Sequence, residues 1–308
     1  MQEIRQPAEL ETGGRKVCVA IGMFDGVHLG HQQVIKQTIS DAQQHNALSL
    51  AVTFDRHPNT IVAPGKAPPL IYSLPQKLHE IELLGMEGIL VLEFTRAFSE
   101  KPGEEFVRWL ANGLGKLSSV AVGSGFSFGY KRSGNVELLK RAGAAVGFQV
   151  HGLAAVSLGG RVVSSTRIRE RIAEGDLDGA SQMLGRTYSV SGRVVRGDQL
   201  GRQLGFPTAN VDVPGLVMPP HGVYAVIAKS GGIAFRGVAN IGVRPTVKKA
   251  ESERRLEVHL PGFSGDLYGT VLEVLFAGFI RPEQRFTNLE ELKKQIHRDI
   301  EAAEILFS

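Results

Sequence analysis

Two histidines, three positions apart, follow the first apolar run of the chain, at His28 and His31. They fall at the start of an expected helix, where free N–H groups and the helix dipole attract anions. Gly26 and Gly30 let the backbone approach a ligand closely, and two imidazoles can donate hydrogen bonds to phosphate oxygens. The pattern predicts a phosphate site suited to nucleotidyl transfer, in which charge builds up on the leaving pyrophosphate.

The surroundings of these histidines favour such a site over two surface residues on a turn. A bare His-x-Gly-His occurs by chance, but here a buried strand precedes it, an amphipathic helix follows it, and Phe24-Asp25-Gly26 lies between them. A zinc site is less well supported, because no third and fourth ligand lies at a suitable spacing. The residues expected to contact nucleotide around the histidines are Gly22, Phe24, Asp25, Gly26 and Gly30.

A second anion-binding pattern occurs at Ser164, Ser165 and Thr166, which are followed by Arg167 and Arg169. Three hydroxyls and a cation at a helix start can cradle a phosphate. Taken alone, Ser or Thr before a helix is usually an ordinary N-cap. If this segment and the two histidines lie on the same parallel sheet, the segment would form the second half of a site that binds a triphosphate.

Side chains with rings follow two further strands. His57, within residues 53–58, could line the site, and a loop histidine without a role is nearly as well supported. Phe126 and Phe128 lie among glycines, where they could stack on a flat ring or belong to the core.

The second half of the chain has a glycine-rich turn, at Gly201, Gly205 and Pro207, before two neutral oxygen ligands, Thr208 and Asn210. Backbone N–H groups of such a turn can bind ATP phosphates. Alternate residues of a strand lie on the same side, so the two ligands could hold Mg²⁺, which prefers oxygen. The turn is not a P-loop, because Gly-Lys-Ser/Thr is missing.

Glu257 alternates with apolar neighbours on an expected strand and could accept a proton from a hydroxyl nucleophile. On sequence alone, a solvent-facing carboxylate is the better supported interpretation, and His259 on the same side adds nothing. Arg244 and Arg281 stand beside prolines at turns, where a surface position is the default interpretation.

These residues need elements that position them, and the first half alternates apolar strands with helices. Strands are expected at 17–24, 48–54, 88–94, 119–122 and 148–158, and helices at 30–46, 73–84, 103–114, 135–145 and 166–184. This alternation is typical of an α/β domain with a Rossmann-like parallel sheet covered on both faces. Ligands of such sheets bind outside the carboxyl ends of the strands.

From Ser189 onward the pattern changes to short strands with frequent glycine and proline. Strands are expected at 189–195, 222–229, 233–240, 255–260 and 269–279, with a hairpin turn at Gly231-Gly232. A helix is expected at 288–307, with Thr287 and Glu290 as a capping box. The pattern predicts a small antiparallel β-barrel with a terminal helix. We place the domain boundary at 184–188, which gives domains 1–184 and 185–308.

The composition excludes several classes of protein. The 308 residues suffice for two domains, and 43% apolar and 21% charged residues are ordinary for a globular chain. The single cysteine, Cys18, excludes an internal disulfide, and its apolar neighbours predict burial. Without an apolar stretch of membrane-spanning length or a signal core, we expect a cytoplasmic protein that does not bind membranes. A net charge of +4 permits nucleic acid as a partner, but no aromatic platform lies in a basic patch.

The joint order of these motifs resembles a known family, the bacterial bifunctional riboflavin kinase/FMN adenylyltransferases, also called FAD synthetases. The resemblance extends from about Val17 to the terminal helix and rests on segments 22–31, 53–58, 123–134, 164–169, 197–210, 237–246, 256–260 and 267–269. It implies an N-terminal adenylyltransferase domain related to nucleotidylyltransferases and a C-terminal riboflavin kinase barrel. Riboflavin would become FMN in the barrel, and FMN would attack the ATP α-phosphorus in the first domain, giving FAD and pyrophosphate.

The resemblance also implies roles for individual residues, with ATP, riboflavin and FMN as substrates and Mg²⁺ as cofactor. Those expected to hold ATP and its leaving pyrophosphate are His28, His31, Ser164, Ser165, Thr166 and Arg169. In the barrel, Thr208 and Asn210 would bind Mg-ATP, and Glu257 would be the catalytic base on the riboflavin 5′-hydroxyl. The residues expected against the flavin are His57, Phe126, Phe128 and Arg281.

The chain departs from this family at two positions. Gly125 stands where the family usually has Asp or Asn, and Arg56 stands where it usually has Pro. A missing polar side chain at position 125 removes one contact to flavin or nucleotide, which affects the efficiency of adenylyl transfer more than its existence. The alternatives are a riboflavin kinase with a weakened adenylyltransferase domain and, less well supported, a basic nucleic-acid-binding protein. The sequence leaves open whether the protein is a homo-oligomer.

Overall fold

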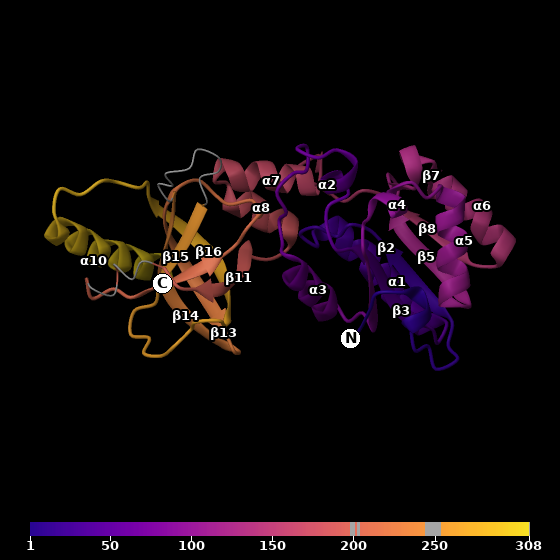
Figure 1. Ribbon diagram of the computed structural model, residues 1–308, viewed down its shortest axis with the longest axis horizontal. Coiled ribbons are helices and arrows are strands. Elements are labelled where there is room, and N and C mark those ends of the chain that lie inside the picture. Colours follow the sequence, from indigo (N-terminus) through magenta and orange to yellow (C-terminus); the bar gives the residue numbers. More distant parts are fainter. Residues whose placement is uncertain (198–200, 202–203, 244–253, 308) are drawn as a thin grey trace. The chain divides into compact units, whose positions relative to one another are not determined.

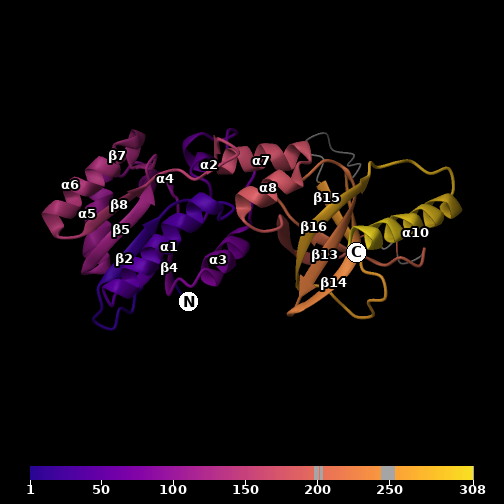
Figure 2. The same ribbon diagram turned by 180° about the vertical axis from the view of Figure 1, so that it is seen from behind.

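The computed structural model describes residues 1–197, 201, 204–243 and 254–307 (Figures 1 and 2). Its contacts divide the chain into two compact units. The first unit comprises Met1–Leu70 and Leu74–Ser165, and the second comprises Ile71–Ser73 and Thr166–Ser308. The domain boundary expected at 184–188 stays a prediction.

The first unit is built on a six-stranded sheet with the strand order β1-β4-β3-β2-β5-β8, in which all neighbours are parallel. The strands are β1 (Gln2–Ile4), β2 (Val17–Ile21), β3 (Leu48–Phe54), β4 (Gly88–Leu92), β5 (Leu117–Gly123) and β8 (Gln149–Leu153). The parallel sheet predicted from the alternating pattern is confirmed, with one short edge strand, β1, that the pattern did not predict.

Helices cover both faces of this sheet because its strands are apolar on both sides. The helices are α1 (Leu29–Gln44) and α3 (Leu74–Leu83) on one face, and α5 (Gly103–Leu114) and α6 (Val136–Val146) on the other. In β2, Val17, Val19 and Ile21 pack with α5 and α6, whereas Ala20 packs with α1 and α3. Cys18 is fully buried, as predicted, and burial raises the pKa of its thiol.

Short elements connect these strands and helices. They are η1 (Pro7–Glu9), α2 (Asn59–Val62), α4 (Arg96–Ser99), β6 (Ser127–Phe128), η2 (Tyr130–Arg132), β7 (Gly134–Asn135), β9 (Ser157–Leu158) and β10 (Arg161–Val162). The strand expected at 148–158 is wrong beyond Leu153, because β9 and β10 form a separate hairpin. Its turn uses Gly159 and Gly160, whose φ angles of 60° and 71° suit glycine.

The strand order places a switch point between β2 and β5. The chain passes from β2 to β3 and β4 on one side and then crosses to β5 on the other side of β2. In open sheets of this kind, ligands bind in the crevice outside the carboxyl ends at the switch point. The segments that leave these two ends are 22–28 after β2 and 124–126 after β5, which both contain expected site residues.

The second unit begins with two helices where one was expected at 166–184. They are α7 (Ser165–Glu174) and α8 (Leu177–Leu184). Gly175 ends the first with a φ of 86°, and Asp176 caps the second by accepting a hydrogen bond from the N–H of Gly179 at 2.9 Å. The expectation of a single helix is therefore wrong. The apolar residues keep a helical spacing across the segment, but Gly175 ends one helix and Asp176 begins the next.

The rest of the second unit is a closed antiparallel barrel with the strand order β11-β12-β15-β14-β13-β16. The strands are β11 (Ser189–Val195), β12 (Thr208–Asp212), β13 (Gly222–Ser230), β14 (Ile233–Val243), β15 (Arg254–His259) and β16 (Val271–Arg281). The predicted barrel is confirmed. Gly231 and Gly232 form the predicted two-residue turn, with φ angles of 56° and 81° that match the common hairpin geometry.

The terminal helix, α10 (Leu289–Leu306), packs against β13, β14 and β16 of the barrel. The capping box expected at Thr287 and Glu290 is wrong by one residue. Asn288 caps the helix by accepting a hydrogen bond from the N–H of Glu291 at 2.9 Å, and Thr287 donates its hydroxyl to the Glu291 carboxylate at 2.7 Å. Within the described residues, every helix falls short of the length and apolar character that a bilayer crossing requires.

Candidate active sites

The loop that joins β2 to α1 (the histidine loop, residues 22–31) has an unusual backbone around Phe24. Phe24 and Val27 have φ angles of 52° and 42°, in the left-handed region that side chains rarely adopt. The buried Phe24 ring folds back over Gly22, where an added Cβ would lie 2.8 Å from the ring. Such strain collects at functional sites, where the surrounding structure enforces it.

The two imidazoles of the histidine loop lie together at the start of α1. His28 is the N-cap, and its Nδ1 accepts a hydrogen bond from the backbone N–H of His31 at 3.3 Å. Because Nδ1 accepts, Nε2 is the donor atom of the His28 ring. The rings stack with their centroids 3.6 Å apart, and Gly30 leaves room for them because an added Cβ would lie 3.2 Å from the His28 ring. Both imidazoles therefore lie where a helix binds an anion.

A hydroxyl of the serine-rich segment contacts the histidine loop. Ser165, the first residue of α7, donates its hydroxyl to the backbone carbonyl of Asp25 at 3.0 Å. Ser164 precedes it and is half-buried. Thr166 and Arg169 belong to the second unit, and their expected part in a triphosphate clamp stays a prediction.

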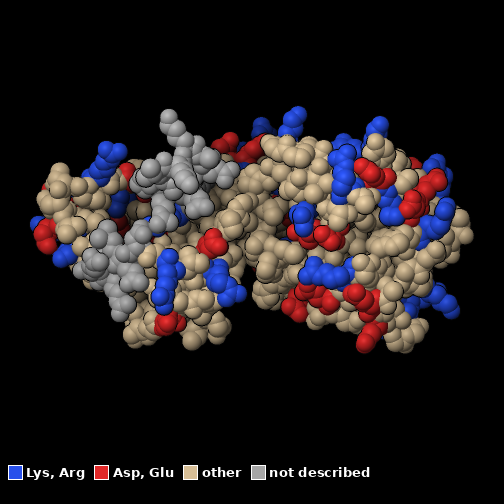
Figure 3. Space-filling model, in the orientation of Figure 1, with Lys and Arg blue, Asp and Glu red and all other residues tan. Residues whose placement is uncertain are grey.

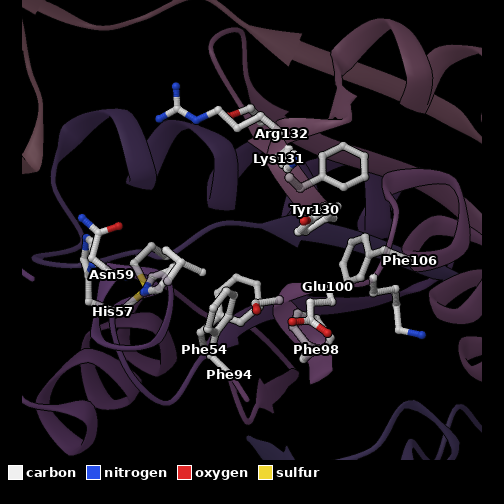
Figure 4. Close-up of a pocket in the computed structure, with 18 of the residues that line it drawn as sticks. Phe54, His57, Asn59, Phe94, Phe98, Glu100, Phe106, Tyr130, Lys131 and Arg132 are labelled. Atoms are coloured by element: carbon white, nitrogen blue, oxygen red, sulfur yellow. The ribbon is translucent and has the colours of Figure 1, made fainter. Parts of the chain in front are cut away.

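A cavity of about 710 Å³ opens beside the histidine loop, and Met23 of that loop lines it. The expected residues that line it are His57, Phe126 and Phe128, and Gly125, one of the two departures from the family, lines it as well. Figure 4 places Phe54 and Phe94 below this cavity, His57 and Asn59 at the left, and Tyr130, Lys131 and Arg132 above. Its size is typical of a small-molecule site.

Aromatic rings make up much of the cavity wall. Phe126 and Phe128 stack with their centroids 5.3 Å apart and 21° between their planes. Both rings also pack against the hydrophobic core of the first unit. The same two rings can therefore belong to the core and line a cavity that takes a flat ring. Phe54, Phe94 and Phe98 form a second group of rings, with edge-to-face centroid distances of 5.5 to 5.9 Å. The sequence analysis missed this group, although Phe54 ends a predicted strand.

The two positions that depart from the family lie at or next to this cavity. Arg56 pairs with Asp55 at 2.6 Å on the surface. Burial would raise the pKa of Asp55, but hydrogen bonds from Arg56 and from the backbone of Phe94 bring it below its usual value. At Gly125, an added Cβ would meet nothing within 4 Å, so the cavity has open space there.

In the barrel, β15 brings Glu257 between two asparagines on neighbouring strands. The register pairs Glu257 with Asn210 of β12 and with Asn240 of β14. In the same way, Thr208 lies opposite His259. Asn240 was missed by the sequence analysis, because only the pairing of β14 with β15 brings it to this place.

Two cavities adjoin β12, and Thr208 lines both of them. The first has about 390 Å³ and is also lined by Gly201, Asn210, Glu257 and Arg281. The second has about 420 Å³ and is lined by Pro207 and residues of the segment 265–268. Thr208 of β12 therefore belongs to the walls of both cavities.

Close packing fixes the residues around β12. Glu257 is half-buried and accepts a hydrogen bond from Arg255 at 3.2 Å. Gly197 makes room for Asn210, because an added Cβ would lie 2.4 Å from the Asn210 amide nitrogen. The carbonyl of Gly201 accepts a hydrogen bond from the N–H of Phe206 at 2.8 Å, which closes the described part of the glycine-rich turn.

The remainder of that turn depends on a left-handed glycine. Gly205 has a φ of 92°, and Pro207 places its carbonyl 2.9 Å from the Nδ1 of His259. Arg244, expected at a surface turn, lies outside the described residues.

Arg281 lines the smaller barrel cavity, but its guanidinium is bound to the terminal helix. Its Nε and Nη2 each donate to Asp299 at 2.7 Å, and its Nη1 donates to the carbonyl of Pro282 at 3.0 Å. The ring of Phe286 lies 5.9 Å from the guanidinium. A direct contact between Arg281 and a flavin stays a prediction.

The oxygen atoms of Thr208 and Asn210 suit the cation expected there. Mg²⁺ takes oxygen ligands and keeps several waters, so two neutral side chains beside a carboxylate can bind it together with phosphates. No three His, Cys, Asp or Glu side chains among the described residues gather into a metal site of their own.

Comparisons with known proteins agree with this architecture. A family model described as FAD synthetase matches residues 11–167, and one described as riboflavin kinase matches residues 184–307. The bifunctional riboflavin kinase/FMN adenylyltransferase of Escherichia coli K12 is 39% identical over 301 residues, covering 97% of this chain and 96% of the relative. The enzyme of the same name from Pseudomonas fluorescens is 40% identical over 307 residues, covering 99% and 98%.

A solved structure supports the fold over the same length. It is titled as a macrolide-efflux protein from Streptococcus pneumoniae and matches with a TM-score of 0.84 and 26% identity, covering 98% of each chain. That title differs from both family models and from the curated relatives, and the likeness supports the fold alone. Two family models in the expected order, and relatives that match nearly end to end, show that the chain belongs to the bifunctional riboflavin kinase/FMN adenylyltransferase family.

Proposed function

We propose that the protein phosphorylates riboflavin to FMN with one ATP and then adenylylates FMN with a second ATP, giving FAD and pyrophosphate. One feature that both units share carries this proposal. Each unit has a cavity large enough for a flavin ring, and a turn suited to binding phosphates lies beside that cavity. The kinase reaction belongs to the barrel, and the adenylyl transfer belongs to the parallel sheet.

For adenylyl transfer, the aromatic cavity holds the isoalloxazine ring and the histidine loop holds the ATP phosphates. A phosphate oxygen of FMN forms a bond to the ATP α-phosphorus, and the bond from that phosphorus to the bridging oxygen of pyrophosphate breaks. The nucleophile is already an anion, so no general base is needed. His28, His31 and the start of α1 stabilise the charge that develops on pyrophosphate. Met23 lines the cavity and belongs to the loop, which brings the two substrates together.

For the kinase step, Glu257 accepts the proton of the riboflavin 5′-hydroxyl. The hydroxyl oxygen forms a bond to the γ-phosphorus of ATP, and ADP leaves. We place riboflavin in the 390 Å³ cavity beside Glu257 and the nucleoside of ATP in the 420 Å³ cavity. The ATP phosphates would lie at Thr208, which lines both cavities, and at Asn210 and Gly201, which line the first. Thr208 and Asn210 hold Mg²⁺, which neutralises the phosphates when it is bound.

A nucleic-acid-binding function has less support than the enzyme. On the face drawn in Figure 3, the coloured Lys and Arg side chains alternate with Asp and Glu, whereas nucleic-acid binding favours one broad basic patch. The use of ATP favours a cytoplasmic location. We therefore retain only the kinase with a weakened first domain as a second candidate, because Gly125 leaves the cavity open at that position.

One experiment tests both steps. Purified protein is incubated with riboflavin, ATP and Mg²⁺, and the flavins are separated by chromatography over time. We expect FMN to appear first and FAD to follow it, with no FMN when Mg²⁺ is chelated. Absence of FMN would overturn the kinase assignment. Supplying FMN and ATP and measuring pyrophosphate separates the bifunctional enzyme from the kinase alone.

A further inference from the structure

Lys77 is a buried cation beneath the histidine loop. It lies on α3, is 3% exposed, and donates three hydrogen bonds from its ammonium group. The acceptors are the carbonyl of Met23 at 3.2 Å, the hydroxyl of Thr53 at 3.1 Å and the carbonyl of Phe54 at 2.8 Å. Lysine is almost never fully buried without such partners.

These acceptors join the loop after β2 to the end of β3. Met23 belongs to the histidine loop, and Thr53 and Phe54 are the last two residues of β3. Thr53 also donates its hydroxyl to the Met23 carbonyl at 3.0 Å, so the three groups close a ring of hydrogen bonds. Because Met23 and Phe54 both line the aromatic cavity, the ring connects the expected phosphate site to the expected flavin site.

The charge of this lysine is unfavourable for folding. Burial lowers the pKa of Lys77 to about 8, although the carboxylates of Asp25 and Asp55 act in the opposite direction. Asp55 is itself paired with Arg56. A buried charge costs stability unless it is fully satisfied, and an apolar side chain of similar size often serves the fold as well. Stability alone therefore does not explain a lysine here.

We propose that Lys77 is a positioning residue for adenylyl transfer, which fixes the Met23 carbonyl and so holds the turn that carries His28 and His31 beside the flavin cavity. The inference rests on the proposed adenylyl transfer in the first unit. Lys77 acts through the loop, and it adds positive charge behind a site that binds two anionic substrates.

The first test replaces the cation by an apolar side chain of similar length. Lys77→Met should lower kcat/KM for FMN adenylylation by about 10- to 100-fold, as expected for a misplaced reacting group. Riboflavin phosphorylation by the same molecule should change by less than about twofold, which reports that the second unit stays folded, and a thermal melt of the variant reports whether the first unit folds. Lys140→Met, an exposed lysine whose side chain is 52% accessible, is the matched control.

The outcomes separate this inference from the proposed function. If the unchanged protein makes no FAD from FMN and ATP, the proposed function fails. If it makes FAD and Lys77→Met does so as fast as Lys140→Met, the positioning role fails alone. If Lys77→Met stays folded in a thermal melt and loses both activities equally, Lys77 serves both sites alike, and the role proposed here is also wrong.

A pH profile gives a readout that a purely structural role would not change. The pKa of Lys77 is about 8 in the folded protein and 10.5 in the unfolded chain. At pH values between these two, the unfolded chain binds more protons at Lys77 than the folded protein does. The contribution of this group to the free energy of unfolding therefore rises with pH in this range. Loss of activity in that window therefore cannot come from unfolding through Lys77. The ratio of adenylylation rate to kinase rate should fall as pH rises through about 8 in the unchanged protein and stay flat in Lys77→Met. The same slope in both proteins would contradict the inference.

A milder substitution, Thr53→Val, keeps the test valid by itself if Lys77→Met folds poorly, because an unchanged ratio of adenylylation to phosphorylation in Thr53→Val would then contradict the inference. Thr53→Val removes the hydroxyl from the ring of hydrogen bonds and keeps the side-chain volume. It should lower adenylylation less than Lys77→Met does, and the double variant should lose little more than Lys77→Met alone, because the two residues act together. Losses that simply multiply would mean that Thr53 and Lys77 act independently, which would overturn the proposed ring.

Discussion

Glu257 lies directly opposite Asn210 in the antiparallel pairing of β12 with β15, and opposite Asn240 in the pairing of β14 with β15. A carboxylate flanked by two amides on adjacent strands has its place fixed by the sheet itself. Glu257 and Thr208 both line the 390 Å³ cavity, and Thr208 also lines the 420 Å³ cavity. This fixed place suits Glu257 for the proposed role of catalytic base.

Glu257→Gln should remove the base and keep the side-chain shape. We expect the kcat for riboflavin phosphorylation to fall by about 10²- to 10⁴-fold, the usual range for general base catalysis. Adenylylation of supplied FMN should not change, because the histidine loop lies in the other unit. Glu290→Gln, on the exposed side of α10, is the control. A kinase rate close to that of Glu290→Gln would show that Glu257 is not the base.

His28→Ala should have the reverse effect. Loss of the imidazole removes a donor to pyrophosphate, and we expect FAD formation from FMN to fall by about 10²- to 10³-fold. Loss of the N-cap should lower the free energy of unfolding by about 1 kcal/mol. His45→Ala, at the exposed other end of the same helix, should change neither rate. If His28→Ala lowered the kinase rate as much as the adenylylation rate, the two sites would not be separate.

Gly125, which lines the aromatic cavity, and Gly134, which packs behind the Phe128 ring in its wall, provide an opposed pair of substitutions. An added Cβ at Gly125 meets nothing within 4 Å, so Gly125→Asn should fold normally, restore a polar contact and lower the KM for FMN. At Gly134 the added Cβ would lie 2.5 Å from the ring of Phe128, so Gly134→Ala should displace that ring and raise the KM. We expect it to lower the free energy of unfolding by about 1–3 kcal/mol, the range for overpacking.

Steady-state kinetics of adenylylation and thermal melts of both glycine variants check these expectations. A lower melting temperature for Gly125→Asn would contradict the open space at that position. An unchanged KM for Gly134→Ala would mean that the Phe128 ring does not contact the flavin.

Most of the fold could be predicted because its causes are local. Buried strands and amphipathic helices in the first half, and glycine turns such as Gly231-Gly232 in the second, each depend on neighbouring residues. The errors arose where two local effects compete. The helical spacing of apolar residues continues through α7 and α8, but Gly175 and Asp176 break the backbone helix between them. A glycine that ends a helix, followed by an N-cap residue, is a pattern visible in the sequence.

The sites could be predicted only in part, because their remaining members come from tertiary contacts. Lys77 has the pattern of a surface lysine on an amphipathic helix, and only the packing of α3 on the sheet brings it to Thr53. Asn240 reaches Glu257 through strand pairing that no local pattern specifies. Motif residues such as His28 could be found, because a helix start and its cap are local features.

Breaking the ion pair of Arg281 with Asp299 should lower stability far more than breaking a second ion pair on the same helix, because it leaves a buried charge without its partner. Their side chains are only 17% and 6% exposed, and breaking one partner of a buried pair costs about 3–5 kcal/mol. Arg236 and Glu304 are 58% and 54% exposed, and such a pair contributes less than about 1 kcal/mol. Asp299→Ala should therefore lower the free energy of unfolding several times more than Glu304→Ala, as measured by urea denaturation.

The same substitution should alter one activity and spare the other. Without Asp299, the Arg281 guanidinium is no longer held in the wall of the 390 Å³ cavity, and the KM for riboflavin should rise. Adenylylation of FMN at a temperature where the barrel remains folded should not change, because Asp299 lies in the second unit. If Asp299→Ala and Glu304→Ala lowered the free energy of unfolding equally, the burial of the Arg281–Asp299 pair would not increase the cost of breaking it.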